Sequence, residues 1–234
     1  IPPMTAPPDA MQLDIVFAER PVGDPLIGDK LWQDLDQATS LTGDARDQLQ
    51  RNGFRVGVSA SRPHSALQTL LGLKSDLAYQ PKAEKAKFLV GRQVMIRSDG
   101  ETQIEASPVC AECTLTIADG TKSTARSFSQ CRGSFKLVAH RLQDSWAKLD
   151  FLPIVLHGAD TLRPIASSEG WQFENTQRSE VFHNQQFQLE LGVGEMVVIS
   201  ADEKATDSLG HLFFVGKSQL HNAPDFNSES TAVQ

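Results

Sequence analysis

The chain has 234 residues, and its 22 Lys and Arg against 29 Asp and Glu give a net charge of −7. This acidic balance excludes a broad nucleic-acid-binding surface, because phosphate contacts need clustered Lys and Arg side chains. No run of about 18 apolar residues occurs, which excludes a membrane-spanning helix. At roughly 150 residues per domain, the length indicates one large or two small domains.

The start of the chain is rich in proline, with four prolines among residues 1–8. Proline does not fit a helix interior or a central strand, so residues 1–10 are predicted to form an extended, disordered linker. The chain begins at Ile1 rather than Met, which indicates an export signal or a membrane tether upstream. A boundary chosen around a disordered region is the alternative. The polar, Ser-rich residues 219–234 are predicted to be a disordered tail.

Residues 11–75 alternate between strand and helix patterns. Apolar residues at every second position predict strands at 12–17 and 54–58. A thin apolar stripe that ends at an Asn-Gly pair predicts a helix over 44–52, and a Ser-Arg-Pro start predicts another helix from residue 61. This order describes a small α/β module whose two helices cover one face of a sheet.

After a polar connection, residues 86–218 consist mostly of strand-like runs separated by turn signals. The predicted strands are 89–96, 102–106, 114–117, 134–139, 146–156, 181–191, 195–200 and 212–215. Asp-Gly pairs between such runs are typical of hairpins, so the strands are predicted to be antiparallel. The expected fold class is therefore α+β: a small α/β module followed by a mostly antiparallel β domain, either a sandwich or a curled sheet.

Three cysteines, Cys110, Cys113 and Cys131, leave several interpretations open. The C-x-x-C of the first two precedes an alternating run rather than a helix, which argues against a thioredoxin-type redox motif. Cys131 and His140 could complete a zinc site, but no second pair of ligands at metal-binding spacing supports it. One disulfide with one thiol left over is plausible in an exported protein. Three ordinary, partly buried cysteines are the interpretation that the sequence favours.

The chain lacks the motifs that mark common catalytic and nucleotide-binding sites. It has no nucleophile elbow, no H-E-x-x-H zinc motif, no P-loop and no dinucleotide-binding glycine pattern. Its six histidines are dispersed along the sequence, with no pair four residues apart. We therefore expect a protein that is not an enzyme and that uses no cofactor and no metal.

Five residues are candidates for ligand or partner contacts: His157, Asp160, Trp171, Phe213 and Phe214. His157 and Asp160 follow an apolar run, and a His and an Asp close together can orient a general base. A turn that ends a strand is the alternative interpretation, and Trp171 would be the nearby aromatic of a ligand site. Phe213 and Phe214 are adjacent in a predicted strand, so one of them must face another layer or a partner chain.

Three stretches of the chain together resemble a family of uncharacterised bacterial proteins that carry export or lipoprotein signals. The similarity lies in residues 31–57 with the run Asn-Gly-Phe-Arg-Val-Gly, in residues 129–158, and in residues 191–214 with the runs Gly-Glu-Met-Val-Val and Leu-Gly-His-Leu-Phe-Phe. It covers about residues 12–215. The family has no known activity, so the resemblance implies a location in the periplasm or cell envelope and no reaction.

The C-terminal part is also similar to the final segment of the secretins, the outer-membrane channels of bacterial secretion, although it lacks the long amphipathic insert of a pore barrel. The resulting hypothesis is a non-enzymatic cell-envelope protein that acts through contacts with a protein partner or through self-association, as a scaffold or a secretion-associated component. The alternative is a small-molecule or glycan-binding module, or a hydrolase with an unfamiliar site near His157.

Overall fold

The computed structural model describes residues 9–36, 41–73, 89–143, 145–167 and 170–215, apart from the side chains of residues 163–175. Most of the predicted linker and the whole predicted tail lie outside these residues. Within the part of the chain so described, no helix is both long and apolar enough to cross a membrane.

Strands dominate the structure, at 56%, and helices are few. The strands are β1 (Ala10–Ala18), β2 (Phe54–Ser59), β3 (Leu89–Arg97), β4 (Gly100–Glu105), β5 (Cys110–Asp119), β6 (Lys122–Gln143), β7 (Trp146–Ser167), β8 (Gly170–Val181), β9 (Phe187–Gly192) and β10 (Met196–Ala201). The helices are α1 (Asp29–Gln33), α2 (Gly43–Arg51), α3 (Ser65–Leu70), α4 (Leu209–Phe214) and the 3₁₀ turn η2 (His183–Gln185). The predicted α+β class, dominated by a curled antiparallel sheet, is confirmed.

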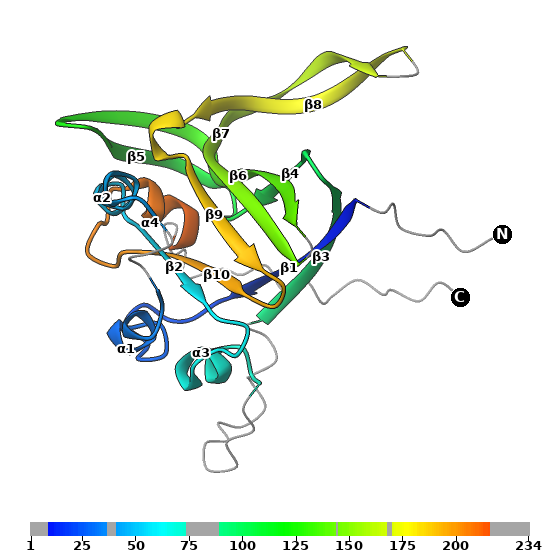
Figure 1. Ribbon diagram of the computed structural model, residues 1–234. Coiled ribbons are helices and arrows are strands. Elements are labelled where there is room, and N and C mark those ends of the chain that lie inside the picture. Colours follow the sequence, from blue (N-terminus) through cyan, green and yellow to red (C-terminus); the bar gives the residue numbers. More distant parts are fainter. Residues whose placement is uncertain (1–8, 37–40, 74–88, 144, 168–169, 216–234) are drawn as a thin grey trace, which may run out of the picture.

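Two strands of 22 residues, β6 and β7, form the centre of the curled sheet. Each strand has different partners along its length: β6 pairs with β5 and then with β4, and β7 pairs with β9 and then with β8. Over such a length the right-handed twist of strands turns successive partners away from one another, so the sheet curls. As a result the β5–β6 and β7–β8 arms extend in different directions (Figure 1).

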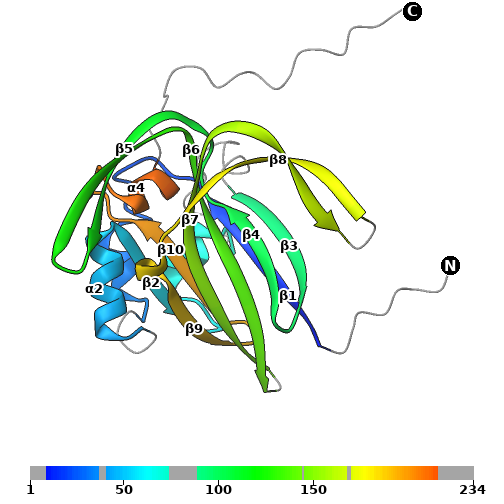
Figure 2. The same cartoon turned by 90° about the horizontal axis from the view of Figure 1, so that it is seen from above.

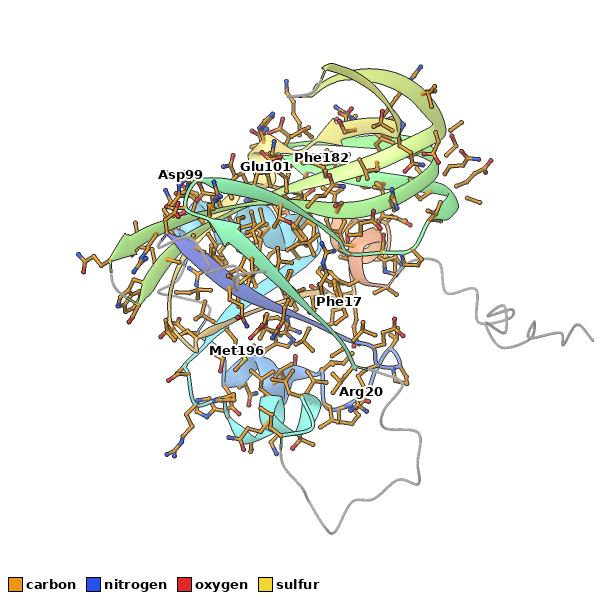
Figure 3. The ribbon with its side chains drawn as sticks, turned by 90° about the vertical axis from the view of Figure 1, so that its right-hand side faces the viewer. Phe17, Arg20, Asp99, Glu101, Phe182 and Met196 are labelled. Carbon is orange, nitrogen blue, oxygen red and sulfur yellow. The ribbon has the colours of Figure 1, made fainter. Side chains whose placement is uncertain are left out.

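The other four strands form two pairs that join distant parts of the chain. β1 pairs with β3, and β2 pairs with β10, both antiparallel. The two strands of the predicted module over 11–75 therefore pair with strands from the predicted β domain over 86–218 instead of with each other. In Figure 3 the β1–β3 pair runs between the curled sheet and the helices α1 and α3, with Asp99 at one end and Phe17 and Arg20 at the other.

The main core is an aromatic cluster contributed by five elements. The Phe213 ring from α4 lies 5.2 Å from the Phe54 ring of β2 and 4.8 Å from the Phe135 ring of β6. Phe151 of β7 and Phe187 of β9 stack with ring centroids 4.8 Å apart. Such ring pairs stabilise a fold beyond their apolar area alone. The many phenylalanines of the sequence therefore fill the space between the sheet, the β2–β10 pair and α4.

A second, smaller apolar cluster joins α1 to α3. Its buried members are Leu31, Trp32, Leu35, Ala66, Leu67 and Leu70. The two helices lie together below the β2–β10 pair, away from the curled sheet, whereas α2 and α4 lie close to β5 (Figure 1). The four helices of the described residues thus occupy two separate places around the β2–β10 pair.

Two of the predicted strands are wrong in part or in whole. Residues 181–191 are interrupted by η2, so that β8 and β9 pair with different parts of β7. Residues 212–215 form the end of a helix, because Ser208 caps α4 by accepting a hydrogen bond from the His211 N–H at 3.2 Å. A short apolar run fits a buried helical turn as well as a strand, and packing decides between them.

Candidate functional site

An exposed apolar group lies at one end of the β6–β7 pair. It consists of Leu142 near the end of β6, Trp146 at the start of β7 and Val193 in the turn between β9 and β10, and it is named the tip cluster. The exposed fractions of these side chains are 46%, 47% and 78%. Figure 2 shows this end of β6 and β7 extending past β9. Tryptophan is usually well buried, so a half-exposed indole at the edge of the fold makes this end of the sheet the candidate site.

Strand pairing brings the tip cluster together. Trp146 lies opposite both Gln143 of β6 and Gly192 of β9, and Leu142 lies in the register shift just before Gln143. A β-carbon on Gly192 would be 3.7 Å from the Trp146 ring, so the indole lies over this glycine. The Val193 N–H donates a hydrogen bond of 2.8 Å to the Ser145 carbonyl, which fixes the β9–β10 turn against the start of β7.

The turn that carries Val193 is itself well defined. The Glu195 carboxylate accepts a hydrogen bond of 2.8 Å from the Gly192 N–H. Gly194 has a φ of 84°, a conformation that a residue with a side chain rarely adopts. The apolar side chain of Val193 is therefore presented in one position, and a partner would lose little binding energy in ordering it.

Trp146 shares the outer face of the sheet with a polar network. Side chains alternate along β7, so Trp146, Lys148 and Asp150 lie on one face, whereas Leu149 and Phe151 are buried on the other. On the neighbouring strand β6, His140 lies directly opposite Lys148. The outer face at this end of the sheet therefore carries an exposed aromatic ring next to a histidine, a lysine and a carboxylate.

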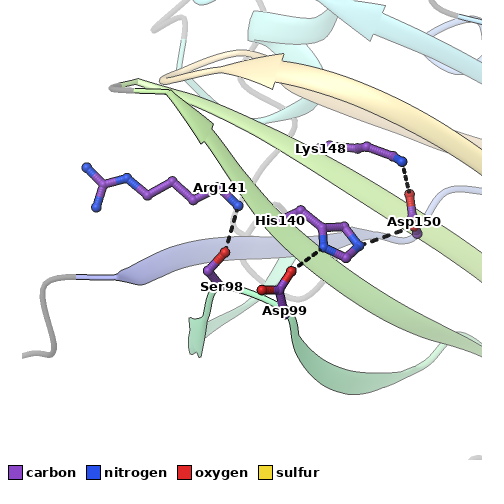
Figure 4. A network of polar contacts seen from close by, with 6 residues as sticks. All are labelled: Ser98, Asp99, His140, Arg141, Lys148 and Asp150. Carbon is purple, nitrogen blue, oxygen red and sulfur yellow. Dashed lines mark hydrogen bonds and ion pairs between the residues drawn. The ribbon is translucent and has the colours of Figure 1, made fainter.

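His140 lies between two carboxylates (Figure 4). Its Nδ1 is 2.6 Å from an oxygen of Asp99, and its Nε2 is 3.3 Å from an oxygen of Asp150. The Lys148 ammonium is 3.8 Å from the other Asp150 oxygen. Next to this network, the Arg141 N–H donates a hydrogen bond of 3.0 Å to the Ser98 hydroxyl. These contacts fasten the turn between β3 and β4 to the outer face of β6 and β7.

The hydrogen bond to Asp99 is the main reason why the pKa of His140 is raised above its ordinary value, and Asp150 adds to this while burial opposes it. The protonated ring donates from both nitrogens, one to each carboxylate. Neither ring nitrogen is then left to exchange a proton with a substrate. The arrangement therefore suits a charged clamp that orders the β3–β4 turn better than a general base.

The residues that the sequence singled out lie elsewhere in the fold. His157, half-buried in β7, packs its ring 5.1 Å from the Phe128 ring, at the point where the β7–β8 register shifts. Asp160 is exposed. The Trp171 backbone pairs with Ala166 in the β7–β8 arm, but its side chain lies outside the described part. A ligand site made by the three side chains stays a prediction.

Phe213 and Phe214 occupy α4 rather than a strand. Phe213 is fully buried, and 36% of the Phe214 side chain is exposed. The Phe214 ring still lies 6.3 Å from the Phe135 ring and 6.4 Å from the Phe54 ring, at the border of the aromatic core. The strand geometry that predicted one outward-facing ring is wrong, and a partner at Phe214 stays a prediction.

Reasoning from the sequence missed Trp146 and His140 as parts of one surface. The sequence predicts Trp146 within a strand. Its position directly after the polar pair Asp144-Ser145 is the signal that this strand begins near solvent. His140 was considered only as a zinc ligand with the cysteines. Among the described residues, no group of three His, Cys, Asp or Glu side chains is arranged to hold a metal ion.

Comparisons of the chain with protein-family models, with curated proteins and with solved structures found no match.

Proposed function

We propose that this protein is a non-enzymatic component of the bacterial cell envelope that binds a protein partner through the tip cluster. The observation that carries the proposal is the exposure of Trp146 beside two further apolar side chains, Leu142 and Val193. Tryptophan is enriched among the few residues that dominate binding energy, because its large ring loses little conformational freedom on binding.

The surroundings of the tip cluster fit the anatomy of a protein interface. Such interfaces have an apolar centre and a polar rim. The tip cluster supplies the centre, and His140, Lys148 and Asp150 on the same face of the sheet supply part of the rim. Hydrogen bonds hold both the β9–β10 turn and the β3–β4 turn before any partner binds, which lowers the ordering cost of association.

The location in the envelope rests on the resemblance to exported and lipoprotein-like bacterial proteins. A scaffold or a secretion-associated component is the role that fits this location and a binding surface. Fractionation of the source bacterium tests the location separately from binding: recovery of the native protein in the periplasmic or envelope fraction supports it, and recovery in the cytoplasm rejects it.

Binding is tested by affinity capture from envelope extract with the wild-type chain and two variants. Trp146→Ala removes the proposed centre of the interface, and Leu162→Ala removes an even more exposed apolar side chain (63%) on the β7–β8 arm. A hot-spot residue contributes at least about 2 kcal/mol, so Trp146→Ala should weaken capture of the partner roughly 30-fold. Leu162→Ala should leave it unchanged.

Equal capture by both variants would reject the proposal. Light scattering on the purified chain identifies a partner that is a second copy: a dimer that dissociates only in Trp146→Ala assigns the tip cluster to self-association.

A further inference from the structure

The three cysteine side chains converge between β5 and β6. The sulfur atoms of Cys113 and Cys131 are 2.7 Å apart, and both residues are buried. Cys110 lies directly opposite Cys131 in the strand register and is half-buried. The Cys110 thiol donates a hydrogen bond of 3.2 Å to the Glu112 carbonyl. It also forms a hydrogen bond with the Cys131 sulfur. The Cys131 sulfur therefore lies within exchange distance of both other thiols.

This convergence requires an unusual local backbone. In regular strands, residues three positions apart face opposite sides of the sheet. In β5, however, two consecutive exposed residues separate Cys110 from Cys113, and in β6 two exposed residues separate Phe128 from Cys131. Gln130, one of these, has a φ of 48°, in the left-handed region. The matched irregularities turn both cysteines of the C-x-x-C toward Cys131.

Neighbouring strands hold the irregularity in place. The Gln177 side-chain amide from β8 donates to the Gln130 carbonyl at 3.1 Å and to the Gly158 carbonyl of β7 at 2.9 Å. The Phe128 ring packs on His157 of β7. The arrangement of the thiols is thus determined by tertiary contacts and not by the hairpin alone.

We propose that Cys113 and Cys131 form a disulfide that fastens β5 to β6, and that Cys110 is the exchange thiol through which this disulfide is made and broken. A disulfide bond is about 2.05 Å long, so closing the bond needs only a small movement of the two sulfurs. This inference does not depend on the proposed function, because the cysteine cluster and the tip cluster lie on different parts of β6.

The exposure of the thiols orders the steps. The hydrogen bond to Cys113 and burial raise the pKa of the Cys131 thiol, which makes it a poor first nucleophile at neutral pH. The half-buried Cys110 thiolate attacks a disulfide oxidant such as oxidised glutathione, breaks its S–S bond and releases one glutathione thiol. Cys131 then attacks the Cys110 sulfur and releases the second glutathione thiol.

In the last step Cys113 attacks the Cys131 sulfur and displaces Cys110 as a free thiol. The two-electron oxidation of Cys113 and Cys131 is balanced by the reduction of one oxidised glutathione to two thiols, which take up the two protons released. Cys110 ends in the state in which it began.

The test oxidises the folded full chain with oxidised glutathione, blocks remaining thiols with iodoacetamide and maps the peptides by mass spectrometry. The expected result is a single alkylated cysteine, Cys110, and a peptide joined through Cys113 and Cys131. The melting temperature should rise by roughly 5–10 °C over the reduced chain. Three alkylated cysteines, or a disulfide that contains Cys110 at equilibrium, would overturn the proposal.

Two variants test the role of Cys110. Cys110→Ser should form the same Cys113–Cys131 disulfide about tenfold more slowly, because the remaining thiols are buried. Cys113→Ser should stop at a disulfide between Cys110 and Cys131. Equal oxidation rates of the wild type and Cys110→Ser would remove Cys110 from the pathway. If a variant does not fold, the peptide map of the wild type still decides the pairing.

Discussion

Gly210 lies directly against the main chain of Gly53. A β-carbon on Gly210 would overlap the Gly53 carbonyl, and the Gly210 N–H donates a hydrogen bond of 2.9 Å to the Asn52 carbonyl. Gly53 itself has a φ of 76° and lies against Ser208. The contact joins the end of α2 to the start of α4, more than 150 positions later in the chain, and thereby seats Phe213 in the aromatic core.

Replacing Gly210 by alanine should destabilise the fold. The added methyl group has no space, so α4 must move away from Gly53 and the Phe213 ring with it. Overpacking of this kind lowers the free energy of unfolding by about 2–4 kcal/mol. Chemical denaturation of Gly210→Ala checks this value.

Gly43→Ala is the matched control, since a β-carbon at this first residue of α2 meets nothing within 4 Å. Alanine favours a helix, so this variant should match or exceed the stability of the wild type by up to about 1 kcal/mol. A loss of the same size in both variants would contradict the close approach at Gly210.

Asn52 is a second residue at this junction whose replacement should be destabilising. It is fully buried; its amide donates to the Gln48 and Ala118 carbonyls, both at 2.9 Å, and its side-chain oxygen accepts from the Ala118 N–H at 3.0 Å. Asn52→Leu would leave the part-buried Ala118 N–H without this partner and remove the two donors of a fully buried amide, at a cost of about 2–4 kcal/mol in unfolding free energy.

The exposed Gln12 provides the comparison for Asn52, since its amide donates a hydrogen bond to the nearby, exposed Asp14 of β1. Gln12→Ala should change the unfolding free energy by less than about 0.5 kcal/mol. Similar losses in the two variants would show that the buried amide of Asn52 has no special role.

Alternation of apolar residues predicted the fold class and most strands, because a half-buried strand has that pattern wherever it pairs. It could not predict that β1 pairs with β3 or β2 with β10, since these partners are chosen by packing across the whole fold. The strand predicted for Leu212–Phe214 is wrong for a related reason: the Phe213 ring is buried by Phe54 and Phe135, which are distant in sequence. Asn52 and Gly210 belong to stretches that carried the family resemblance, and both act in packing.

The candidate site was harder to predict than the fold. Whether Trp146 faces the core or the solvent depends on its register opposite Gly192, which no local pattern reveals. The spacing of the C-x-x-C likewise does not reveal that Cys110 and Cys113 converge, because residues three apart in a regular strand face opposite sides. Both thiols nevertheless contact Cys131, next to the left-handed Gln130, whose carbonyl accepts a hydrogen bond from Gln177 of β8.

The His140 clamp should make stability depend on pH. Because the pKa of His140 is raised in the folded protein, its stabilisation is fully present below the ordinary histidine pKa of 6.5 and is lost as pH rises through the folded-state value. The difference in unfolding free energy between the wild type and His140→Gln should therefore be larger at pH 5.5 than at pH 9.

Asp99→Asn is the control for the clamp, because Asn also tolerates the left-handed backbone of residue 99, whose φ is 62°. In the Asp99→Asn background, the loss of unfolding free energy caused by His140→Gln should differ less between pH 5.5 and pH 9 than it does in the wild type. If the unfolding free energies of the wild type and His140→Gln differ by the same amount at pH 5.5 and at pH 9, the ionised clamp is contradicted.

The most direct test of the binding account keeps Trp146 and places a photocrosslinking amino acid at the exposed position 143, directly opposite Trp146, or, as control, at position 162 of the full chain. After illumination in envelope extract of the organism that produces the chain, the account predicts one defined crosslinked protein, or a defined dimer of the chain, from position 143 and none from position 162. The same crosslinks from both positions, or none from position 143, would contradict a protein-binding role for the tip cluster.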